Sequence, residues 1–334
     1  YGESIATTGT AIKTSTDSAI KSIMAETVAE TDCDISWYDD EAKSFVIINE
    51  EQIRGLSNLV NGTAVNTSGT AIAAKSFYEK TITLGDNINL EDKEWTPIGR
   101  TDASKFEGRF DGKGLTISGL YINTEGTNLG LFGYIGATAE IKNLTVSGSV
   151  TETSPQGYGN ICIGGIVGYV NGAAKLTNLT NKTNVKISRS YAGGIAGYVY
   201  GEAVFENCNN EGDVSAERYA GGIVGHITTG SVKNSTNKGN ITDISGYSGG
   251  IAAQLATGTI EDCINEGTIS GSYYKGGIVS YIQTGTVNRC INRGTVKLNV
   301  KNSAGGIVGG LYGAGTIKNC INEGSVDVEG MTTA

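Results

Sequence analysis

Histidine and proline are almost missing from this sequence, and one common cysteine pattern is missing altogether. The 334 residues include 1 His and 2 Pro. A single His leaves little room for His-based metal sites or for His as a repeated general base. The 6 cysteines form no Cys-X-X-Cys pair, so zinc ribbons and thioredoxin-like redox sites have no support. No apolar run reaches the length of a membrane-spanning helix, and we expect no direct membrane insertion.

Positive charge is also scarce. Lys and Arg total 25 against 34 Asp and Glu, for a net charge of −9. No basic stripe occurs, which disfavours a nucleic-acid partner and an anionic membrane surface. The hydrophobic fraction of 38% is enough for a packed core and argues against wholesale disorder. The first residue is Tyr1 rather than Met, so we expect the chain to start either after a removed segment or at an artificial boundary, and export cannot be read from it directly.

Glycine is abundant, with 50 residues, and it marks a repeat. With so little proline and no three-residue period, it excludes collagen. The tripeptide Gly-Gly-Ile recurs every 27 to 29 residues, beginning at Gly164, Gly193, Gly221, Gly249, Gly276 and Gly305. Apolar residues alternate over short runs within each unit, which is a strand pattern. Units of this size bury an apolar face only by stacking. The sequence therefore predicts an all-β protein: a right-handed parallel β-helix in which each repeat is one coil.

The repeat occupies only part of the chain. Residues 1–35 carry no repeat and contain a helical pattern from Thr16 to Glu30. Residues 36–80 are predicted to hold a strand, a helix and a polar loop, and residues 81–334 to form the coils. No cap signature follows Val328, so we expect further domains or a partner at that end.

The segment before the coils carries a well-marked helix. A strand is predicted at 45–48, and Asn49 then caps a helix from Glu50 to about Val60. The dipeptide Asn61-Gly62 ends it. A solenoid needs a cover over its terminal edge and core, so we predict that this helix is the N-terminal cap.

Two columns of small polar residues run through the repeats. One is predicted to be a structural ladder stacked at a turn, because Asn tolerates left-handed backbone and stacked amides bond from coil to coil. Its members are Asn181, Asn210, Asn237, Asn265, Asn292 and Asn322. Two residues earlier lie Cys208, Ser235, Cys263, Cys290 and Cys320. We interpret these cysteines as buried free thiols, with disulfides or a thiol metal site as the alternative.

An aromatic column lies five residues after the first Gly of each pair. Its members are Tyr134, Tyr169, Tyr198, His226 and Tyr281, with Gln254 and Gly310 in the remaining coils. Strand alternation turns this column outward, together with an apolar column of Val167, Ala196, Val224, Ala252, Val279 and Val308. We predict an exposed stripe that binds a carbohydrate or a protein. The alternative is that this column and a second one, Tyr191, Tyr219, Tyr247 and Tyr274, are only structural ladders.

Three segments carry a family resemblance. Trp95–Gly99, Phe106–Ile117 and Gly130–Gly133 resemble bacterial surface proteins with the GLUG motif. Gly130-Leu131-Phe132-Gly133 matches the motif, whereas later units read Gly-Gly-Ile-Val-Gly or Gly-Gly-Ile-Ala-Gly. The resemblance covers about residues 36–328 and implies a bacterial protein that is secreted or held at the cell surface, often with adhesin-like repeats. It carries over no catalytic residue, because the motif is structural.

Two functions remain open from the sequence. The first is a non-catalytic surface scaffold or adhesin, whose partner is a host or cell-wall glycan or a surface protein. The second is a polysaccharide lyase or glycoside hydrolase, since parallel β-helices host both. Sugar cleavage commonly needs two carboxylates across a cleft, but the acids lie mainly in Glu-Gly turns, at Glu211, Glu266 and Glu323. We therefore predict a protein that is not an enzyme, with no catalytic residue, no metal site and no cofactor.

Overall fold

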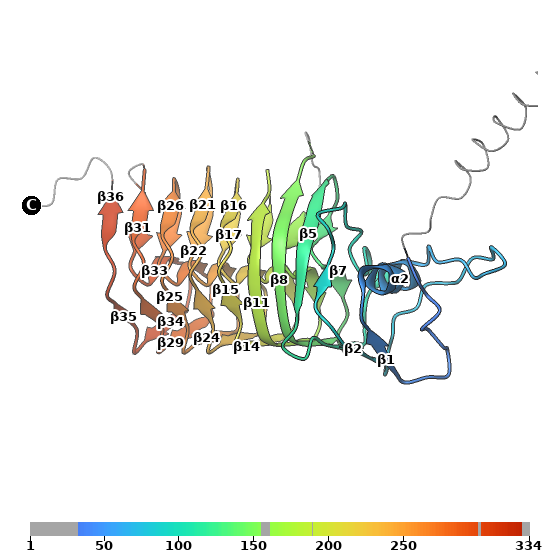
Figure 1. Cartoon of the computed structure of the whole chain (residues 1–334). Helices are drawn as coiled ribbons and strands as arrows, with labels where there is room; N and C mark the ends of the chain where they lie inside the picture. The colour runs from blue at the N-terminus through green and yellow to red at the C-terminus, as the bar shows by residue number, and fades with distance from the viewer. Residues whose placement is uncertain (1–32, 155–160, 189, 300–301, 329–334) are drawn as a thin grey trace, which may run out of the picture.

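The described part of the chain folds into a parallel β-solenoid with one α-helix near its N-terminal end and a single 3-10 turn, η1 (Asp102–Ser104) (Figure 1). The computed structural model describes residues 33–154, 161–188, 190–299 and 302–328. The solenoid has about eight turns of about 29 residues each, which confirms the predicted all-β coil architecture. The helical pattern predicted from Thr16 to Glu30 lies outside the described residues. Within those residues, no helix combines the length and apolarity that crossing a membrane requires.

Two narrow sheets run along the solenoid, and neighbouring strands in each are parallel. The first narrow sheet consists of β7 (Phe132–Ile135), β10 (Val167–Asn171), β13 (Ala196–Tyr200), β18 (Val224–Ile227), β23 (Ala252–Leu255), β28 (Val279–Ile282) and β33 (Val308–Leu311). The second consists of β6 (Asn128–Leu129), β9 (Cys162–Gly164), β12 (Tyr191–Gly193), β17 (Tyr219–Gly221), β22 (Tyr247–Gly249), β27 (Tyr274–Gly276) and β32 (Ala304–Gly305). Each Gly-Gly-Ile tripeptide forms the corner between these two sheets.

A large sheet forms the rest of the wall. Its early strands are β1 (Ser44–Ile47), β2 (Thr81–Leu84), β3 (Ile88–Asn89), β4 (Arg109–Asp111), β5 (Thr116–Thr124), β8 (Glu140–Glu152) and β11 (Lys175–Lys186). In later coils it is divided into three short strands per turn. These are β14 (Val204–Glu206), β15 (Asn209–Asn210), β16 (Val214–Ala216), β19 (Ser231–Lys233), β20 (Thr236–Asn237), β21 (Ile241–Asp243), β24 (Thr259–Glu261), β25 (Ile264–Asn265), β26 (Ile269–Gly271), β29 (Thr286–Asn288), β30 (Ile291–Asn292), β31 (Val296–Leu298), β34 (Thr316–Lys318), β35 (Ile321–Asn322) and β36 (Val326–Val328).

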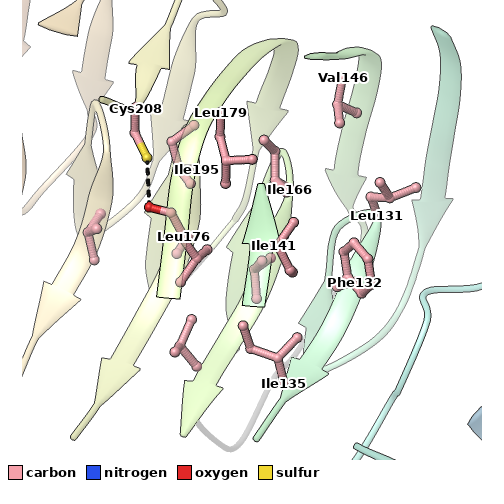
Figure 2. Packing of buried hydrophobic residues seen from close by; sticks show 14 of the residues in the cluster. Leu131, Phe132, Ile135, Ile141, Val146, Ile166, Leu176, Leu179, Ile195 and Cys208 are labelled. Carbon is pink, nitrogen blue, oxygen red and sulfur yellow. Dashed lines mark hydrogen bonds between the residues drawn. The ribbon is translucent and has the colours of Figure 1, made fainter. Parts of the chain in front are cut away.

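The core is a stack of aliphatic side chains, one set for each coil. Ile166, Ile195 and Ile223 occupy the third position of successive Gly-Gly-Ile corners and are fully buried. Figure 2 shows Ile166 and Ile195 pointing into the interior with Leu176 and Leu179. Because each residue packs on its equivalents above and below, the core continues from coil to coil.

The predicted cap helix is present as α2 (Glu50–Asn61). The Asn49 side chain accepts a hydrogen bond from the Gln52 backbone N–H at 3.0 Å, and Gly62 ends the helix in left-handed backbone at φ 70°. The helix buries an apolar face of Ile53, Leu56, Leu59 and Val60. It lies beside the first coils in Figure 1, where a cap belongs. The strand before it, β1, pairs in parallel with β2 and so already belongs to the large sheet.

The opposite end of the solenoid is more exposed. In the last described coil, Leu311 and Ile317 are exposed, although their equivalents in the preceding coil, Ile282 and Val287, are fully buried. The reason is that no coil stacks on this one within the described residues.

Candidate functional site

The asparagine column forms one continuous chain of side-chain hydrogen bonds through the interior. Each Nδ2 donates to Oδ1 of the equivalent residue in the next coil, from Asn181 to Asn322, at 2.7 to 2.8 Å. Each Nδ2 also donates to a backbone carbonyl two residues on, such as Gly212 O at 2.8 Å from Asn210. From Asn181 to Asn292, both N–H groups of each amide are therefore satisfied away from water, as burial of a polar group requires, whereas Asn322 at the end of the column is exposed.

The left-handed backbone lies elsewhere than we predicted. The ladder residues sit in short extended strands, such as Asn210 in β15. The left-handed corner is three residues earlier, at Asn178, Asn207, Asn234, Asp262, Arg289 and Asn319. Two of these corner residues form an outer ladder that sequence reasoning missed, with Asn207 Nδ2 donating to Asn178 Oδ1 at 3.1 Å. The inner column is thus a chain of hydrogen bonds between side-chain amides, and its residues do not form the turn.

The asparagine ladder also explains one glycine column. A Cβ added to Gly194 would lie 2.3 Å from Oδ1 of Asn210, and one added to Gly165 would lie 2.1 Å from Oδ1 of Asn181. The second Gly of each corner thus faces the amides across the interior, so a larger residue has no room there.

The described cysteines are free thiols. Cys208, Cys263 and Cys290 are fully buried, and their Sγ atoms lie near backbone carbonyls, as Figure 2 shows for Cys208 and Leu176 O at 3.5 Å. Burial raises the pKa of Cys208 to about 12, so this thiol is not a ready nucleophile. No group of metal-binding side chains occurs among the described residues.

The outward aromatic column is a stack. Adjacent ring centroids lie 4.7 Å apart for Tyr134 and Tyr169, 5.3 Å for Tyr169 and Tyr198, and 4.6 Å for Tyr198 and His226, with rings within 14° of parallel. Gln254 continues the column, because its Oε1 forms a hydrogen bond with His226 Nδ1 at 3.1 Å. The residue paired with Gln254 on the next strand is Tyr281. All five predicted residues are therefore members of one column, and the interior rings have a neighbour on each face.

The second tyrosine column stacks in the same way and meets the first edge to face. Tyr191 and Tyr219 lie 4.8 Å apart at 21°, whereas Tyr191 meets Tyr198 at 4.9 Å and 70°. The apolar column lies between the two sets of rings along the chain. We predicted that it would be exposed, and this is wrong: Val167, Ala196, Val224, Ala252 and Val279 are fully buried. Where the two columns meet edge to face, as at Tyr191 and Tyr198, the large rings lie on either side in the chain of a small residue, Ala196, which has no exposed surface.

The rings of the column are uncharged, although the Asp102 carboxylate lies beside Tyr134 at one end. His226 is 8% exposed, and burial lowers its pKa to about 4, so the imidazole is uncharged at neutral pH. Burial raises the pKa of Tyr169 to about 12, and the phenol keeps its proton. The stack therefore offers hydroxyl groups that donate and accept hydrogen bonds, and no charge.

The turn acids pair with cations of neighbouring coils. Glu211 lies 3.4 Å from Lys182, and Arg293 lies 3.7 Å from Glu266 and 3.0 Å from Glu323. These pairs are on the surface and run along the solenoid axis.

A hollow of about 460 Å³ lies beside the end of α2, lined by residues of 61–74, 96–104 and 126–129. Arg100 is the one charged residue among its described lining residues. Facing carboxylates, as glycoside hydrolysis commonly needs, are not among those lining residues.

Sequence reasoning missed a polar cluster inside the core. Asp243, Ser248 and Lys275 are buried at positions where other coils carry small or apolar residues. The detectable signal was the departure of these residues from their repeat columns.

The geometry defines a class: a parallel β-helix whose coils are joined by side-chain ladders. The GLUG motif family matches residues 188–215 and 216–242. These matches cover two successive coils, and they confirm that the chain carries GLUG repeats within a β-solenoid.

Two individual proteins resemble the chain. A protein of Evansella cellulosilytica, provisionally described as a Gly-rich membrane protein, is 46% identical over 55 residues, which are 16% of this chain and 6% of that protein. The chain thus spans a small fraction of that relative. A crystal structure from Bacteroides ovatus, provisionally described as an immunoglobulin A1 protease, is 21% identical with a TM-score of 0.54. That match covers 86% of this chain and 84% of the other, and it shows a shared fold.

Proposed function

We propose that this chain is a non-catalytic scaffold of the bacterial cell surface or secreted fraction, and that it binds a glycan along its outward aromatic column. The stacked rings from Tyr134 to Tyr198 carry the proposal. They form a rigid row with a repeat of one coil, and a linear polymer lying along the axis meets the same group in each coil. Tyrosines held in a stack lose little conformational entropy when a ligand binds.

The stacking decides which part of each tyrosine meets the ligand. A neighbouring ring covers each face of Tyr169, so a sugar cannot lie flat on it. The outer edge and the hydroxyl group remain, and protonated phenols suit the hydroxyl groups of a sugar. The proposed contact is therefore a row of hydrogen bonds with ring-edge packing.

The side chains that could serve as nucleophile, acid or base favour a scaffold over an enzyme. The buried thiols and the neutral His226 have structural partners, and the turn acids pair with Lys or Arg. The neighbour described as a protease shares the fold at an identity that carries no activity over. A polysaccharide lyase or hydrolase remains the competing function.

The test is binding of the whole chain to an array of host and cell-wall glycans. Tyr169→Phe/Tyr198→Phe removes two hydroxyl groups and keeps the stack, so affinity should fall about tenfold, from two lost hydrogen bonds of about 0.7 kcal/mol each. Tyr200→Phe is the matched control, since Tyr200 is exposed at the end of the same strand and outside the column. Its affinity should equal that of the parent.

Three outcomes contradict the proposal. Equal binding by the double variant and the parent would place the ligand elsewhere, and binding to no glycan would leave the column as a structural ladder. Release of oligosaccharides from acidic polysaccharide, measured in parallel, would favour the enzyme.

A further inference from the structure

Among the described residues, one lysine is fully buried in the interior of the solenoid. Lys275, in β27, and Ser248, in β22, are fully buried, and Asp243, in β21, is 4% exposed. The Lys275 Nζ forms an ion pair with Asp243 Oδ2, and it also donates to Gly246 O at 3.0 Å and Tyr274 O at 3.2 Å. Burying two charges costs several kcal/mol for each ion before their attraction is counted. A core of this kind is more simply filled with apolar residues.

The repeat itself shows that the cluster is a local departure. Asp243 aligns with Ala216 of the preceding coil, and Lys275 aligns with Ala304 of the following one. Ser248 aligns with Ala220 on one side and with Lys275 on the other. Three positions that are Ala in a neighbouring coil have thus become polar together, and they converge on one point.

Gly271 leaves space for the carboxyl group of Asp243. A Cβ added to Gly271 would lie 2.7 Å from Asp243 Cγ, whereas Leu298 occupies the paired position in the next coil. A side chain at position 271 would collide with the carboxyl group.

The two oxygens of Asp243 have different surroundings. Oδ1 accepts from the backbone N–H of Gly246 at 2.9 Å and of Ser272 at 3.4 Å. Oδ2 meets the Ser248 hydroxyl group and the Lys275 amine. Two backbone donors on one oxygen are the arrangement that stabilises a tetrahedral oxyanion. A hydroxyl donor on the other oxygen is the arrangement that helps it to leave.

We propose that Lys275 and Asp243 condense once into an intramolecular isopeptide bond, promoted by the groups that surround them. A proton first passes from the ammonium to the carboxylate, which gives a neutral amine and a carboxylic acid. The Nζ lone pair then forms a bond to Cγ, and Oδ1 takes up the negative charge between its two backbone donors. One proton moves from the nitrogen to Oδ2, with the Ser248 hydroxyl as the carrier, and the Cγ–Oδ2 bond breaks. One water molecule leaves, and an amide remains with no change in oxidation state.

The surroundings favour each part of this step. Desolvation lowers the pKa of Lys275, against the opposing effect of Asp243, and so brings the reactive neutral amine within reach. The fold holds the amine and the carboxyl group in contact, which replaces a bimolecular encounter with an intramolecular one. The product would join two neighbouring coils covalently, and unlike a disulfide it would resist reducing agents.

The experiment is the intact mass of the purified, fully denatured chain, which an ion pair cannot alter. The expected mass is lower than that of the sequence by one water molecule. Proteolysis and tandem mass spectrometry should then find the peptides carrying Asp243 and Lys275 as one branched species.

Variants separate this bond from other dehydrations. Lys275→Met removes the amine and should restore the full mass, whereas Lys297→Arg, at an exposed position, should keep the loss of water. Ser248→Ala should lower the cross-linked fraction in freshly folded protein. A full mass for the folded parent would overturn the proposal. So would a loss of water that persists in Lys275→Met, because that points to another site, such as a succinimide at Asp111-Gly112. The parent's own peptides decide the question even if a variant fails to fold.

Discussion

Removing one amide from the middle of the asparagine ladder should cost much more stability than removing one from its end. Asn265 accepts from Asn237 Nδ2 at 2.8 Å, and it donates to Asn292 Oδ1 at 2.7 Å and to Gly267 O at 2.9 Å. In Asn265→Ala, one N–H of the buried Asn237 loses its acceptor, and its other N–H keeps Gly239 O. Asn292 Oδ1 and Gly267 O each lose a donor inside a dry core. At about 1–3 kcal/mol for each of these three buried polar groups left without a partner, the loss is about 6 kcal/mol.

Asn322→Ala is the matched control. Asn322 accepts from Asn292 and donates to Gly324 O, but it is exposed, so water replaces what is lost. We expect a cost of about 1 kcal/mol or less. Urea titration followed by circular dichroism measures both variants against the parent.

The comparison of the two sites tests the reasoning directly. Equal losses for Asn265→Ala and Asn322→Ala would mean that burial does not set the cost of breaking the ladder. A loss under about 1 kcal/mol at Asn265 would mean that the neighbouring amides find new partners, and the ladder would then be no more than local turn chemistry.

Three further predictions concern the core and the aromatic column. Ile223→Ala should lower the free energy of unfolding by about 2–5 kcal/mol in urea titration, because Ile223 is fully buried and the coil cannot close the cavity. A loss under about 1 kcal/mol would contradict the tight packing around Ile223. Gly222→Ala should cost about 3 kcal/mol or more, or prevent folding, because the new Cβ would lie 2.0 Å from Gly250 O and 2.4 Å from Asn237 Cγ; a stable variant with an unchanged midpoint would refute this. The pKa of His226 is lowered to about 4 in the folded chain, so between about pH 6.5 and pH 4 the unfolded chain binds a proton that the folded chain does not. As the pH is lowered from about 6.5 to 4, the free energy of unfolding should therefore decrease by about 3 kcal/mol more in the parent than in His226→Gln. An NMR titration of His226 with a midpoint near pH 6.5 would contradict the burial argument.

The regular features of the fold were predictable because each coil repeats the same physical problem. The recurrence of Gly-Gly-Ile predicted the period, and the cap helix followed from Asn49, the apolar spacing and Gly62. The alignment of asparagines predicted that their side chains would meet, since equivalent positions of parallel coils lie one strand spacing apart.

Features that depend on how two columns meet were not predictable. Alternation placed Ala196 and Tyr198 on the same face of a strand, but it did not show that Tyr191 would meet Tyr198 edge to face and that Ala196 would be buried. The position of the left-handed corner was also missed. Asn suits both a corner and a ladder of side-chain amides, and the sequence does not distinguish the Asn at the corner from the Asn in the ladder.

By itself, the sequence determined the period of the solenoid, the residues that share a column and the helix that covers its first coils, because these depend on local patterns repeated many times. Only the tertiary structure decided which faces of those columns remain open. Both faces of the Tyr169 ring are covered by Tyr134 and Tyr198. Asp243 and Lys275, 32 residues apart in the chain, meet in the core because the winding of the coils brings two different sheets together. Contacts between columns depend on the angle at each corner, and no single repeat encodes that angle in its spacing.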